Sequence, residues 1–463
     1  MREKCPHCGN ALPEDSTPCP CRAAENMQSN PEIADDTGEK KKTPFLLRKL
    51  PFAVLLTAVV CLVAGLIMFF SVLTPVDADK IALFQQDMLP VAVESEGEDG
   101  NPVLLWGYLN RNGEFAIEPC YEEAKEFSDV GLAPVKKDGA WGYINQAGDF
   151  VIEPQFEDAA PFSEKKLAAV KMNDSYGYIN KKGDFVINPQ FDSAYPFAQN
   201  GLALVSIGGN TGVPKYGYIN TDGVYVITPQ YDMAGSFDEH GLAAVYAFGN
   251  WGMIDKNGEW VINPQFDGIE SFADNDLALV YKDGKFGFIN RDGVYVVEPT
   301  YEDAGGFVGN LALVKKDGKY GYINKKGEVV IDFLFDGARS FAENGLAAVM
   351  PSASDGLWGF IDKDGELVID AKFDTVGNFS MGLAYAVEDG EWFFLDKNGD
   401  TAIALGEDCV GADDFYADGY TLVYYLEDGK AVCRVIDKKG TLESESFSFA
   451  RPSSVSMLPP IER

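Results

Sequence analysis

The sequence predicts an all-β repeat array that is preceded by a small zinc ribbon and one transmembrane helix. The first observation is a five-residue phrase, aromatic-Gly-aromatic-aliphatic-Asn/Asp, whose glycines from Gly107 to Gly359 are 34 to 40 residues apart. The second is a pair of cysteine motifs within the first 21 residues, and the third is a stretch of 23 uncharged residues from Pro51 to Leu73. A fixed period of this length indicates a repeat architecture rather than a conventional enzyme domain.

The cysteine motifs at the N-terminus carry the most definite chemistry in the chain. Cys5 and Cys8 form a Cys-x-x-Cys-Gly knuckle, and Cys19 and Cys21 follow as Cys-x-Cys. Four thiolates at this spacing complete a tetrahedral shell for a structural Zn²⁺. The segment resembles the short zinc ribbons of many bacterial membrane proteins, although its second half departs from Cys-x-x-Cys. His7 is an alternative ligand, and a redox dithiol is the rival interpretation, for which no βαβ frame is visible.

The uncharged stretch predicts a transmembrane helix over residues 50–74. At ~1.5 Å per residue, 23 helical residues span roughly 34 Å, which is enough to cross a hydrocarbon core of ~30 Å. A signal peptide is the alternative, but its apolar region would be shorter and closer to residue 1. Cleavage after the helix stays open. Residues 23–49, which are polar and basic, predict a flexible linker.

Charges on both sides of the helix predict its orientation. Asp77 and Asp79 follow the helix, whereas its N-terminal side carries Lys40, Lys41, Lys42, Arg48 and Lys49. Because the positive side stays in the cytoplasm, we expect a single-pass plasma-membrane protein with a cytoplasmic N-terminus and extracellular repeats.

The net charge of −34 excludes one class of partner. Residues 1–50 carry eight basic and eight acidic side chains, so the remaining 30 basic and 64 acidic residues account for the whole excess. A domain this acidic is repelled by phosphate backbones, and we therefore expect no nucleic-acid binding.

The repeated phrase decays along the chain. Its third residue begins as Tyr108 and Tyr143 and ends as Val435, where the tenth copy has lost both the aromatic residue and the glycine. The ten copies start at Trp106, Trp141, Tyr176, Tyr216, Trp251, Phe286, Tyr320, Trp358, Trp392 and Cys433.

Each unit divides into strands. In the sixth unit, residues 277–281, 286–290 and 295–299 are apolar runs separated by Asp-Gly turns, which are strong hairpin signals. We expect Pro299, which cannot donate to a ladder, to end the third strand. A further Phe, such as Phe307, precedes the next unit on a short fourth strand or a packed loop.

The recurring glycine inside the second strand needs a reason, because Gly costs entropy there. We expect its missing side chain to make room for a neighbouring ring or backbone. One unit cannot bury its apolar face alone, so stability requires stacking of unit on unit. Radial stacking gives β-propeller-like blades in a ring or a spiral, and linear stacking gives the alternative, an open β-solenoid of hairpins.

The repeated residues resemble the bacterial WG-repeat family, named for its Trp-Gly pair. The resemblance covers about residues 89–440, with Asp-Gly turns and Pro-Gln-Phe/Tyr-Asp/Glu in register. The Pro position is lost at Phe333, Ala371 and Leu405, which fits a capping role for the terminal units. The resemblance implies an interaction module of mostly unassigned ligand and transfers no catalytic residue.

Catalysis has few candidate residues. The two histidines, His7 and His240, cannot assemble a Ser/His/Asp or His-rich metal site. One acid recurs in each unit, and we interpret it as a turn cap or hydrogen-bond acceptor rather than as half of a catalytic pair. The recurring acids are Glu122, Glu157, Asp192, Asp232, Asp267, Glu302, Asp336 and Asp374. We expect no enzymatic activity.

Three function classes remain. The first, which we favour, is an outward-facing scaffold that binds a protein, a peptide or a cell-envelope polymer. The second is a carbohydrate binder whose repeat aromatics stack on sugar rings, against which the rings are interpreted as packing between units. The aromatics concerned are Trp106, Trp141, Trp251, Trp358 and Trp392. The third is calcium binding by loops at 255–259, 362–366 and 396–400, which hairpin turns explain better.

Three cysteines lie beyond the membrane segment. Cys120 stands alone, and Cys409 and Cys433 either pair or stay free, so they form no disulfide framework. The predicted organisation is a zinc ribbon at 1–22, a linker at 23–49, a transmembrane helix at 50–74 and a juxtamembrane linker at 75–88. Ten repeats follow at 89–450, and then a tail at 451–463.

Overall fold

The computed structural model describes residues 81–97, 100–208, 212–273, 275–442 and 444–448. Every regular element among these residues is a β-strand, from β1 to β38. They contain no helix that is long and apolar enough to cross a membrane. The predicted zinc ribbon and the predicted transmembrane helix lie outside the described residues.

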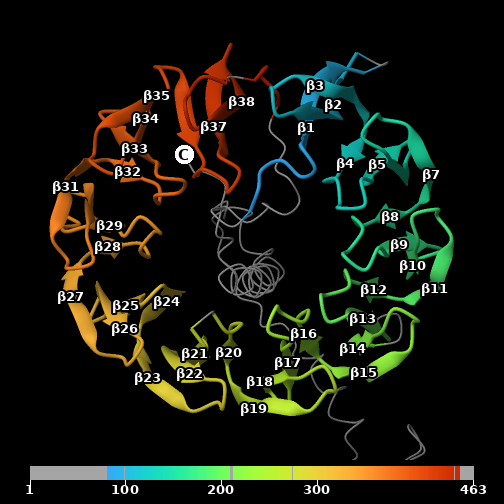
Figure 1. The fold of residues 1–463 in the computed structure, drawn as a ribbon, viewed down its shortest axis with the longest axis horizontal. Coiled ribbons are helices and arrows are strands. Elements are labelled where there is room, and N and C mark those ends of the chain that lie inside the picture. Colours follow the sequence, from blue (N-terminus) through green and yellow to red (C-terminus); the bar gives the residue numbers. More distant parts are fainter. Residues whose placement is uncertain (1–80, 98–99, 209–211, 274, 443, 449–463) are drawn as a thin grey trace, which may run out of the picture. The chain divides into compact units, whose positions relative to one another are not determined.

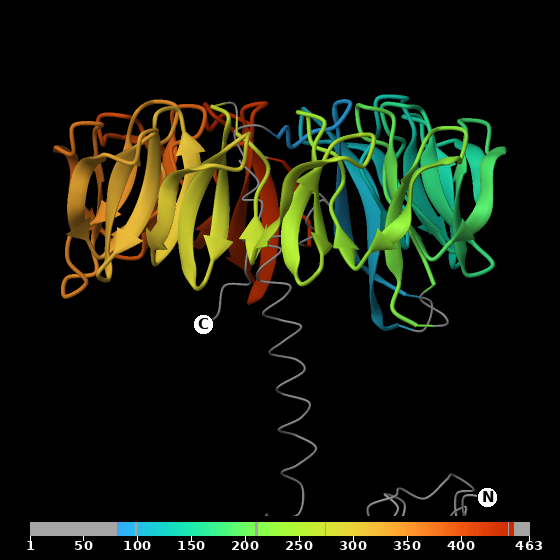
Figure 2. The ribbon, with the colours of Figure 1, turned by 90° about the horizontal axis from the view of Figure 1, so that it is seen from below.

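The strands form ten antiparallel sheets arranged around a ring (Figure 1). This arrangement confirms the all-β repeat array and decides for propeller-like blades in a ring against the open solenoid. We number the blades 1 to 10 in chain order, so that copy n of the phrase lies in blade n. Figure 2 shows the ring from the side, with the strands of each blade running between its two faces.

Blades 2 to 9 have four strands each, which we call inner, second, third and outer. The first four of them comprise β4 (Glu123–Ala124), β5 (Ala133–Lys137), β6 (Ala140–Ile144), β7 (Phe150–Phe156); β8 (Asp158–Ala159), β9 (Ala168–Met172), β10 (Ser175–Ile179), β11 (Phe185–Phe191); β12 (Ser193–Ala194), β13 (Ala203–Ile207), β14 (Lys215–Ile219), β15 (Tyr225–Tyr231); and β16 (Met233–Ala234), β17 (Ala243–Ala247), β18 (Asn250–Ile254), β19 (Trp260–Phe266).

Blades 6 to 9 repeat this pattern. They comprise β20 (Gly268–Ile269), β21 (Leu277–Lys282), β22 (Lys285–Asn290), β23 (Tyr295–Tyr301); β24 (Asp303–Val308), β25 (Leu311–Lys316), β26 (Lys319–Asn324), β27 (Val329–Phe335); β28 (Gly337–Ala338), β29 (Ala347–Met350), β30 (Trp358–Ile361), β31 (Leu367–Phe373); and β32 (Thr375–Val376), β33 (Ala384–Glu388), β34 (Glu391–Leu395), β35 (Thr401–Ala404).

Blades 1 and 10 have three strands each. Blade 1 comprises β1 (Met88–Glu96), β2 (Pro102–Asn110) and β3 (Phe115–Tyr121), and blade 10 comprises β36 (Cys409–Ala412), β37 (Tyr420–Glu427) and β38 (Lys430–Asp437). The chain runs outward through each blade and returns to the inner strand of the next one. Because the strands alternate in direction, the second-to-third hairpins lie on one face of the ring. The inner-to-second loops lie on the other face.

The recurring glycine is explained by a bulge in the outer strand. In blade 2, Trp141 pairs with Phe156 and Tyr143 pairs with Ile152, so three residues of β7 face Gly142 alone. A Cβ atom on Gly142 would lie 2.6 Å from the carbonyl oxygen of Ile152, which no side chain tolerates. The expectation that the glycine makes room for a neighbour is confirmed, and the neighbour is backbone.

The same bulge corrects the prediction that the proline ends the third strand of the unit. Pro154 lies inside β7, which continues to Phe156. At the bulge the ladder is interrupted, so the missing N–H of proline removes no regular hydrogen bond. The proline therefore marks the bulge and not the end of the strand.

The core lies between neighbouring blades. Tyr143 of blade 2 is completely buried, and its ring centroid lies 5.0 Å from that of Phe162 in blade 3. Its hydroxyl donates a 2.8 Å hydrogen bond to the carbonyl oxygen of Ala160, also in blade 3. Tyr108, Tyr178, Tyr218 and Tyr322 donate equivalent bonds of 2.7 to 2.8 Å. Each of these blades therefore holds the inner strand of the next blade, as expected for units that cannot bury a core alone.

The ring closes where blade 10 meets blade 1. Phe447 pairs with Cys433 of β38, and the adjacent Ser448 pairs with Ala92 of β1. The C-terminal segment thus pairs first with the last strand of blade 10 and then with the first strand of blade 1. Elsewhere in the ring, the outer strand of one blade is followed in the same way by the inner strand of the next. Leu83 and Phe84, which the sequence assigned to a linker, are each 2% exposed and belong to the core of this junction.

Candidate functional site

The loops between inner and second strands vary in sequence against a constant frame. Each begins after a buried Phe at the end of the inner segment, and we call the residues between that Phe and the second strand the mouth loop. In blade 2 the loop turns at Gly131, with φ of 77°, and Ser128 Oγ donates to the carbonyl oxygen of Leu132 at 2.8 Å. The first two mouth-loop residues are Ser128-Asp129, Ser163-Glu164, Ala198-Gln199, Asp238-Glu239, Val308-Gly309, Ala342-Glu343, Ser380-Met381 and Tyr416-Ala417 in blades 2 to 5 and 7 to 10.

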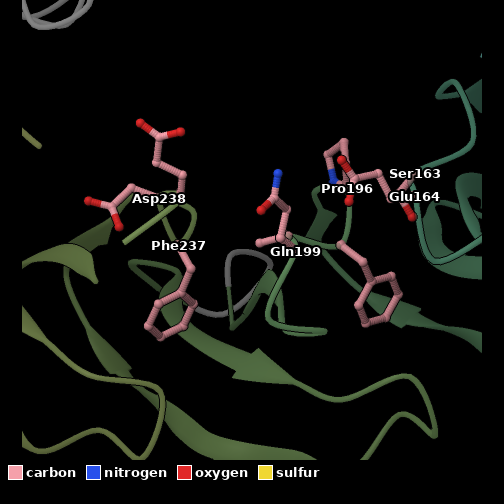
Figure 3. A pocket seen from close by; sticks show the side chains of 9 residues that line it. Ser163, Glu164, Pro196, Gln199, Phe237 and Asp238 are labelled. Carbon is pink, nitrogen blue, oxygen red and sulfur yellow. The ribbon is translucent and has the colours of Figure 1, made fainter. Parts of the chain in front are cut away.

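Three consecutive mouth loops, those of blades 3, 4 and 5, line an open pocket of about 370 Å³. Figure 3 shows the polar ends of Asp238, Gln199 and Glu164 at one level, above the ring of Phe237. The lining comprises Ser163, Glu164, Pro196, Phe197, Ala198, Gln199, Phe237, Asp238 and Glu239. We call it the mouth pocket.

The described residues that line the mouth pocket include three carboxylates and no basic side chain. Asp238 Oδ1 accepts the backbone N–H groups of His240 and Leu242, both at 2.9 Å, and thereby fixes the turn. Asp238 Oδ2 is buried and has no hydrogen-bond partner in the described structure. His240 Nε2 is also buried without a hydrogen-bond partner in the described structure, and it lies 3.8 Å from Glu239 Oε1.

The recurring acid of each unit acts on the opposite face of the ring. Glu122 accepts the N–H of Gly139 through both carboxylate oxygens, at 3.1 and 3.2 Å, at the tip of the β5–β6 hairpin. Asp267 Oδ2 accepts the N–H of Asp283 at 2.7 Å in the same way. The interpretation of these acids as turn caps is confirmed where such bonds form.

The Asp-rich loops considered for calcium are the turns between third and outer strands. Asp255 Oδ1 accepts the N–H groups of Asn257 and Glu259, both at 2.9 Å. The hydrogen bonds to this carboxylate lower the pKa of Asp255, although burial acts in the opposite direction. Asp362 and Asp396 make the same pair of bonds, so the loops are built as Asx-type turns.

The tryptophans of the phrase belong to the blades. Trp141 is 4% exposed and Trp251 is 6% exposed, and both lie in apolar clusters with residues of the next blade. Lys125 Nζ lies 4.5 Å from the Trp141 ring centroid, which covers the ring further. Trp106, Trp358 and Trp392 are half-buried, and each packs against the apolar cluster of another junction between blades.

A model of the WG containing repeat matches residues 106–139, 141–175, 176–210, 216–246, 251–286, 286–320, 320–350 and 358–392, which together exceed half of the chain. The chain belongs to the WG containing repeat family. No curated protein sequence matches it.

Solved structures similar to the WG-repeat ring include a eukaryotic initiation factor, with 12% identity, 78% of this chain and 96% of that chain covered, and a TM-score of 0.45. Porphyromonas gingivalis dipeptidyl peptidase 4 has 11% identity, with 65% of this chain and 60% of that chain covered, and a TM-score of 0.38. Likeness at this level carries no argument about what the WG-repeat ring binds.

The remaining predicted sites separate into two groups. Cys5, Cys8, Cys19 and Cys21 lie outside the described residues, so the zinc site stays a prediction. Cys120 is exposed, whereas Cys409 and Cys433 are buried free thiols. The central strand β37 separates the strands of the last two, which places them about 9.5 Å apart at typical strand spacing, beyond disulfide reach. Burial raises the pKa of the Cys409 thiol to about 11, so it is inert.

Sequence reasoning missed the mouth pocket, because its residues lie where the WG-repeat pattern is weakest. One signal was present: the loop Asp238-Glu239-His240-Gly241 puts an acid where most other units place Ser or Ala. The spatial relation of this loop to Gln199 and Glu164 depends on the radial stacking of consecutive blades, which the sequence left open against linear stacking.

Proposed function

We propose that this chain is a membrane-anchored, outward-facing WG-repeat scaffold that binds a protein, a peptide or a cell-envelope ligand and performs no catalysis. The observation that carries the proposal is that repeated residues and variable residues occupy different places in each unit. The repeated residues form the turns, the bulges and the core between the blades. Variable residues occupy the mouth loops, three of which line an open pocket.

The alternative, carbohydrate binding through the repeat aromatics, finds less support. A sugar ring needs an exposed aromatic face, and the rings of Trp141 and Trp251 have only 4% and 6% of their surface available. We therefore propose that the ligand binds at the mouth loops and that the tryptophans have a structural role.

Cross-linking from two positions tests the scaffold. A photoreactive amino acid replaces Gln199 in the mouth pocket or Val226 on the outer strand of the same blade, where it is 43% exposed, in the full chain in its producing cells. We expect a cross-linked species that is specific to position 199. Equal products at both positions, or none at either, would refute binding through the mouth loops.

The anchoring part of the proposal rests on the uncharged stretch at 51–73 and the basic residues before it. A protease added to intact cells should degrade the ring and spare an epitope placed before residue 50; the reverse pattern would overturn the topology. The full chain in detergent should also contain one Zn²⁺, which a double substitution of Cys5 and Cys8 by Ser should abolish. A zinc content that does not respond to these substitutions would rule out the cysteine site.

A further inference from the structure

We propose that the second-to-third hairpins of blades 4 and 5 form a docking surface for a basic, amphipathic protein segment. The apolar side chains of that segment pack on Phe248 and Val213, and its lysine and arginine side chains meet the carboxylates of the flanking hairpins. This surface lies on the opposite face of the ring from the mouth loops. The proposal therefore does not rest on binding through the mouth loops and adds a second site to it.

Phe248 occupies a turn position at which comparable hairpins place Asp or Asn. The turn of blade 5 consists of Phe248, with φ of 54°, and Gly249, with φ of 86°. The first turn residues of the comparable hairpins are Asp138, Asn173, Asp283, Asp317, Asp389 and Asp428, with φ of 50° to 53°. Turns of this type favour Asn, Asp and Gly, because a bulky side chain makes the left-handed conformation unfavourable. Phe248 therefore holds a backbone conformation that its own side chain opposes.

The strain at Phe248 is not offset by burial of its ring. The side chain is 90% exposed, so its apolar surface lies in water. Asp or Asn at this position would remove both costs, as the comparable hairpins show. Strained residues that persist in a structure cluster at functional sites. The combination of strain and exposure indicates a partner that covers the ring of Phe248.

The hairpin of blade 4, which neighbours that of blade 5 in the ring (Figure 1), extends the apolar surface. Val213, two residues before β14, is 72% exposed. Asp232 connects the two hairpins. Its carboxylate pairs with Lys215 at the start of β14, and its N–H donates to the carbonyl oxygen of Tyr246 at 3.3 Å. Val213 and Phe248 each lie two residues from one of these contacts and thus belong to one surface.

The charge around this surface selects the chemistry of the partner. The hairpins of the flanking blades 3 and 6 carry Asp174 and Asp283 at their tips, and both side chains are exposed. Asp174 also pairs with Lys171 of its own hairpin at 3.3 Å. Beyond residue 50 the chain has 64 acidic residues and 30 basic ones, so its field attracts a basic segment. The apolar residues of that segment then find an apolar centre within a charged rim.

Two other occupants suit this surface less well. A second copy of the chain would bring two surfaces of the same negative charge together, which opposes association. A lipid bilayer binds amphipathic surfaces whose polar residues are mostly lysine and arginine, whereas the hairpins beside Phe248 end in carboxylates. The experiments below distinguish both occupants from a basic segment.

Saturation-transfer NMR on the full chain in phosphatidylcholine nanodiscs tests the proposal with three capped peptides, Lys-Lys-Leu-Leu-Lys-Lys, Glu-Glu-Leu-Leu-Glu-Glu and Lys-Lys-Ser-Ser-Lys-Lys. We expect transfer to the leucine methyl groups of the first peptide and none to the second or the third. Transfer to the acidic peptide, or equal transfer to both basic peptides, would overturn the proposal. Absence of transfer to all three would do the same.

Phe248→Asn is the decisive variant, because Asn occupies the same turn position at Asn173. The affinity for the basic leucine peptide should fall about tenfold, as expected when one aromatic anchor is lost. The melting temperature should stay the same or rise, since Asn tolerates a positive φ. The matched control is Val294→Asn on the mouth face, where Val294 is 59% exposed without a positive φ; it should leave the affinity unchanged. A fall in the melting temperature of Phe248→Asn, or equal loss of affinity in both variants, refutes the docking surface.

Photo-cross-linking identifies what covers Phe248 in the producing cells. p-Benzoylphenylalanine replaces Phe248 in the full chain and keeps an aromatic side chain at the turn, and the linked peptide is sequenced by mass spectrometry. A link to a segment that combines lysine or arginine with apolar residues supports the proposal. A lipid adduct, a link to a second copy of this chain, a link to a segment without basic residues, or no product overturns it. The position-199 product should persist in the Phe248→Asn chain, so the two binding surfaces can fail separately.

Discussion

The junctions between regular blades and the junction that closes the ring are held together by different contacts. Between regular blades, a buried tyrosine such as Tyr143 donates its hydroxyl to the inner strand of the next blade and packs against a Phe there. At the junction of blades 10 and 1, charged side chains make the corresponding contacts. Asp418 accepts the N–H groups of Leu83 and Phe84 at 3.1 and 3.0 Å, and Arg111 Nη1 lies 3.4 Å from its carboxylate.

The difference follows from what each blade faces. A regular blade packs against a copy of itself, so one contact to backbone recurs at the five junctions where the phrase carries a tyrosine. Blade 10 packs against a blade 1 that lacks an inner strand preceding it in the chain, and segments 81–84 and 444–448 fill the gap. The decayed tenth phrase, with Cys433 and Val435 at the aromatic positions, therefore belongs to closure. In the closed ring the terminal units contact each other, which corrects the capping role that the decay suggested.

The largest effect should come from the regular region. Trp251→Ala removes a ring that is 6% exposed between blades 5 and 6. Truncation of a buried aromatic residue typically costs roughly 3–5 kcal/mol, and we expect a clear fall in the melting temperature measured by circular dichroism. Trp260→Ala in the same blade is the control, because that ring is 36% exposed and should cost much less. An unchanged melting temperature for Trp251→Ala would contradict its structural role and revive the sugar-stacking hypothesis.

Overpacking the bulge should be the next largest effect. A Cβ on Gly252 would lie 2.5 Å from the carbonyl oxygen of Ile262 and 2.8 Å from the nitrogen of Pro264, so Gly252→Val must displace backbone. We expect a loss near the upper end of the roughly 1–3 kcal/mol seen for overpacked cores. Gly306→Val is the matched control, since a Cβ there meets nothing within 4 Å. Equal melting temperatures for the two variants would refute the explanation of the recurring glycine.

The closing region should respond to Asp418→Ala. The change leaves the N–H groups of Leu83 and Phe84 without their acceptor, and a buried donor left unpaired costs roughly 1–3 kcal/mol. The control is Asp276→Asn in the mouth loop of blade 6, which keeps a residue that tolerates the local φ of 64° and removes an exposed ion pair with Arg291 that is worth about 0–1 kcal/mol. Proteolysis of the Asp418 variant should begin at the junction of blades 10 and 1. If cleavage begins in a regular blade, the junction is not the point at which the ring opens.

The sequence predicted the repeated part of this structure well, because repetition supplies the signal. Asp138-Gly139 predicts a hairpin turn, and both residues have a positive φ, 52° and 78°. Whether the units close could not be predicted. Closure depends on contacts of Asp418 and Ser448 with partners more than 300 residues away, which no feature of the repeated pattern signals. The mouth pocket could not be predicted either, because it forms only where consecutive blades stack radially and bring Glu164, Gln199 and Asp238 to one place.

The last comparison concerns one repeat position in the two regions. Asp413 of blade 10 is buried and accepts hydrogen bonds from the hydroxyls of Tyr424 and Tyr416 at 3.0 and 3.3 Å. Glu270 occupies the corresponding position in blade 6, where its N–H donates to Leu279 as that of Asp413 donates to Leu422. Burial raises the pKa of the Glu270 carboxyl from 4.5 to about 8.

The folded chain therefore keeps a proton on Glu270 that the unfolded chain loses above its ordinary pKa. Stability should fall as pH rises from about 4.5 to about 8 and level off above that range. Glu270→Gln mimics the protonated form, so the difference in melting temperature between variant and parent should be near zero at pH 4.5 and grow in favour of the variant toward pH 8. Glu298→Gln, on the exposed outer strand of the same blade, should follow the parent at every pH. A Glu270→Gln difference that does not change between pH 4.5 and 8 would mean that the carboxyl titrates normally, and the contrast with Asp413 would lose its electrostatic basis.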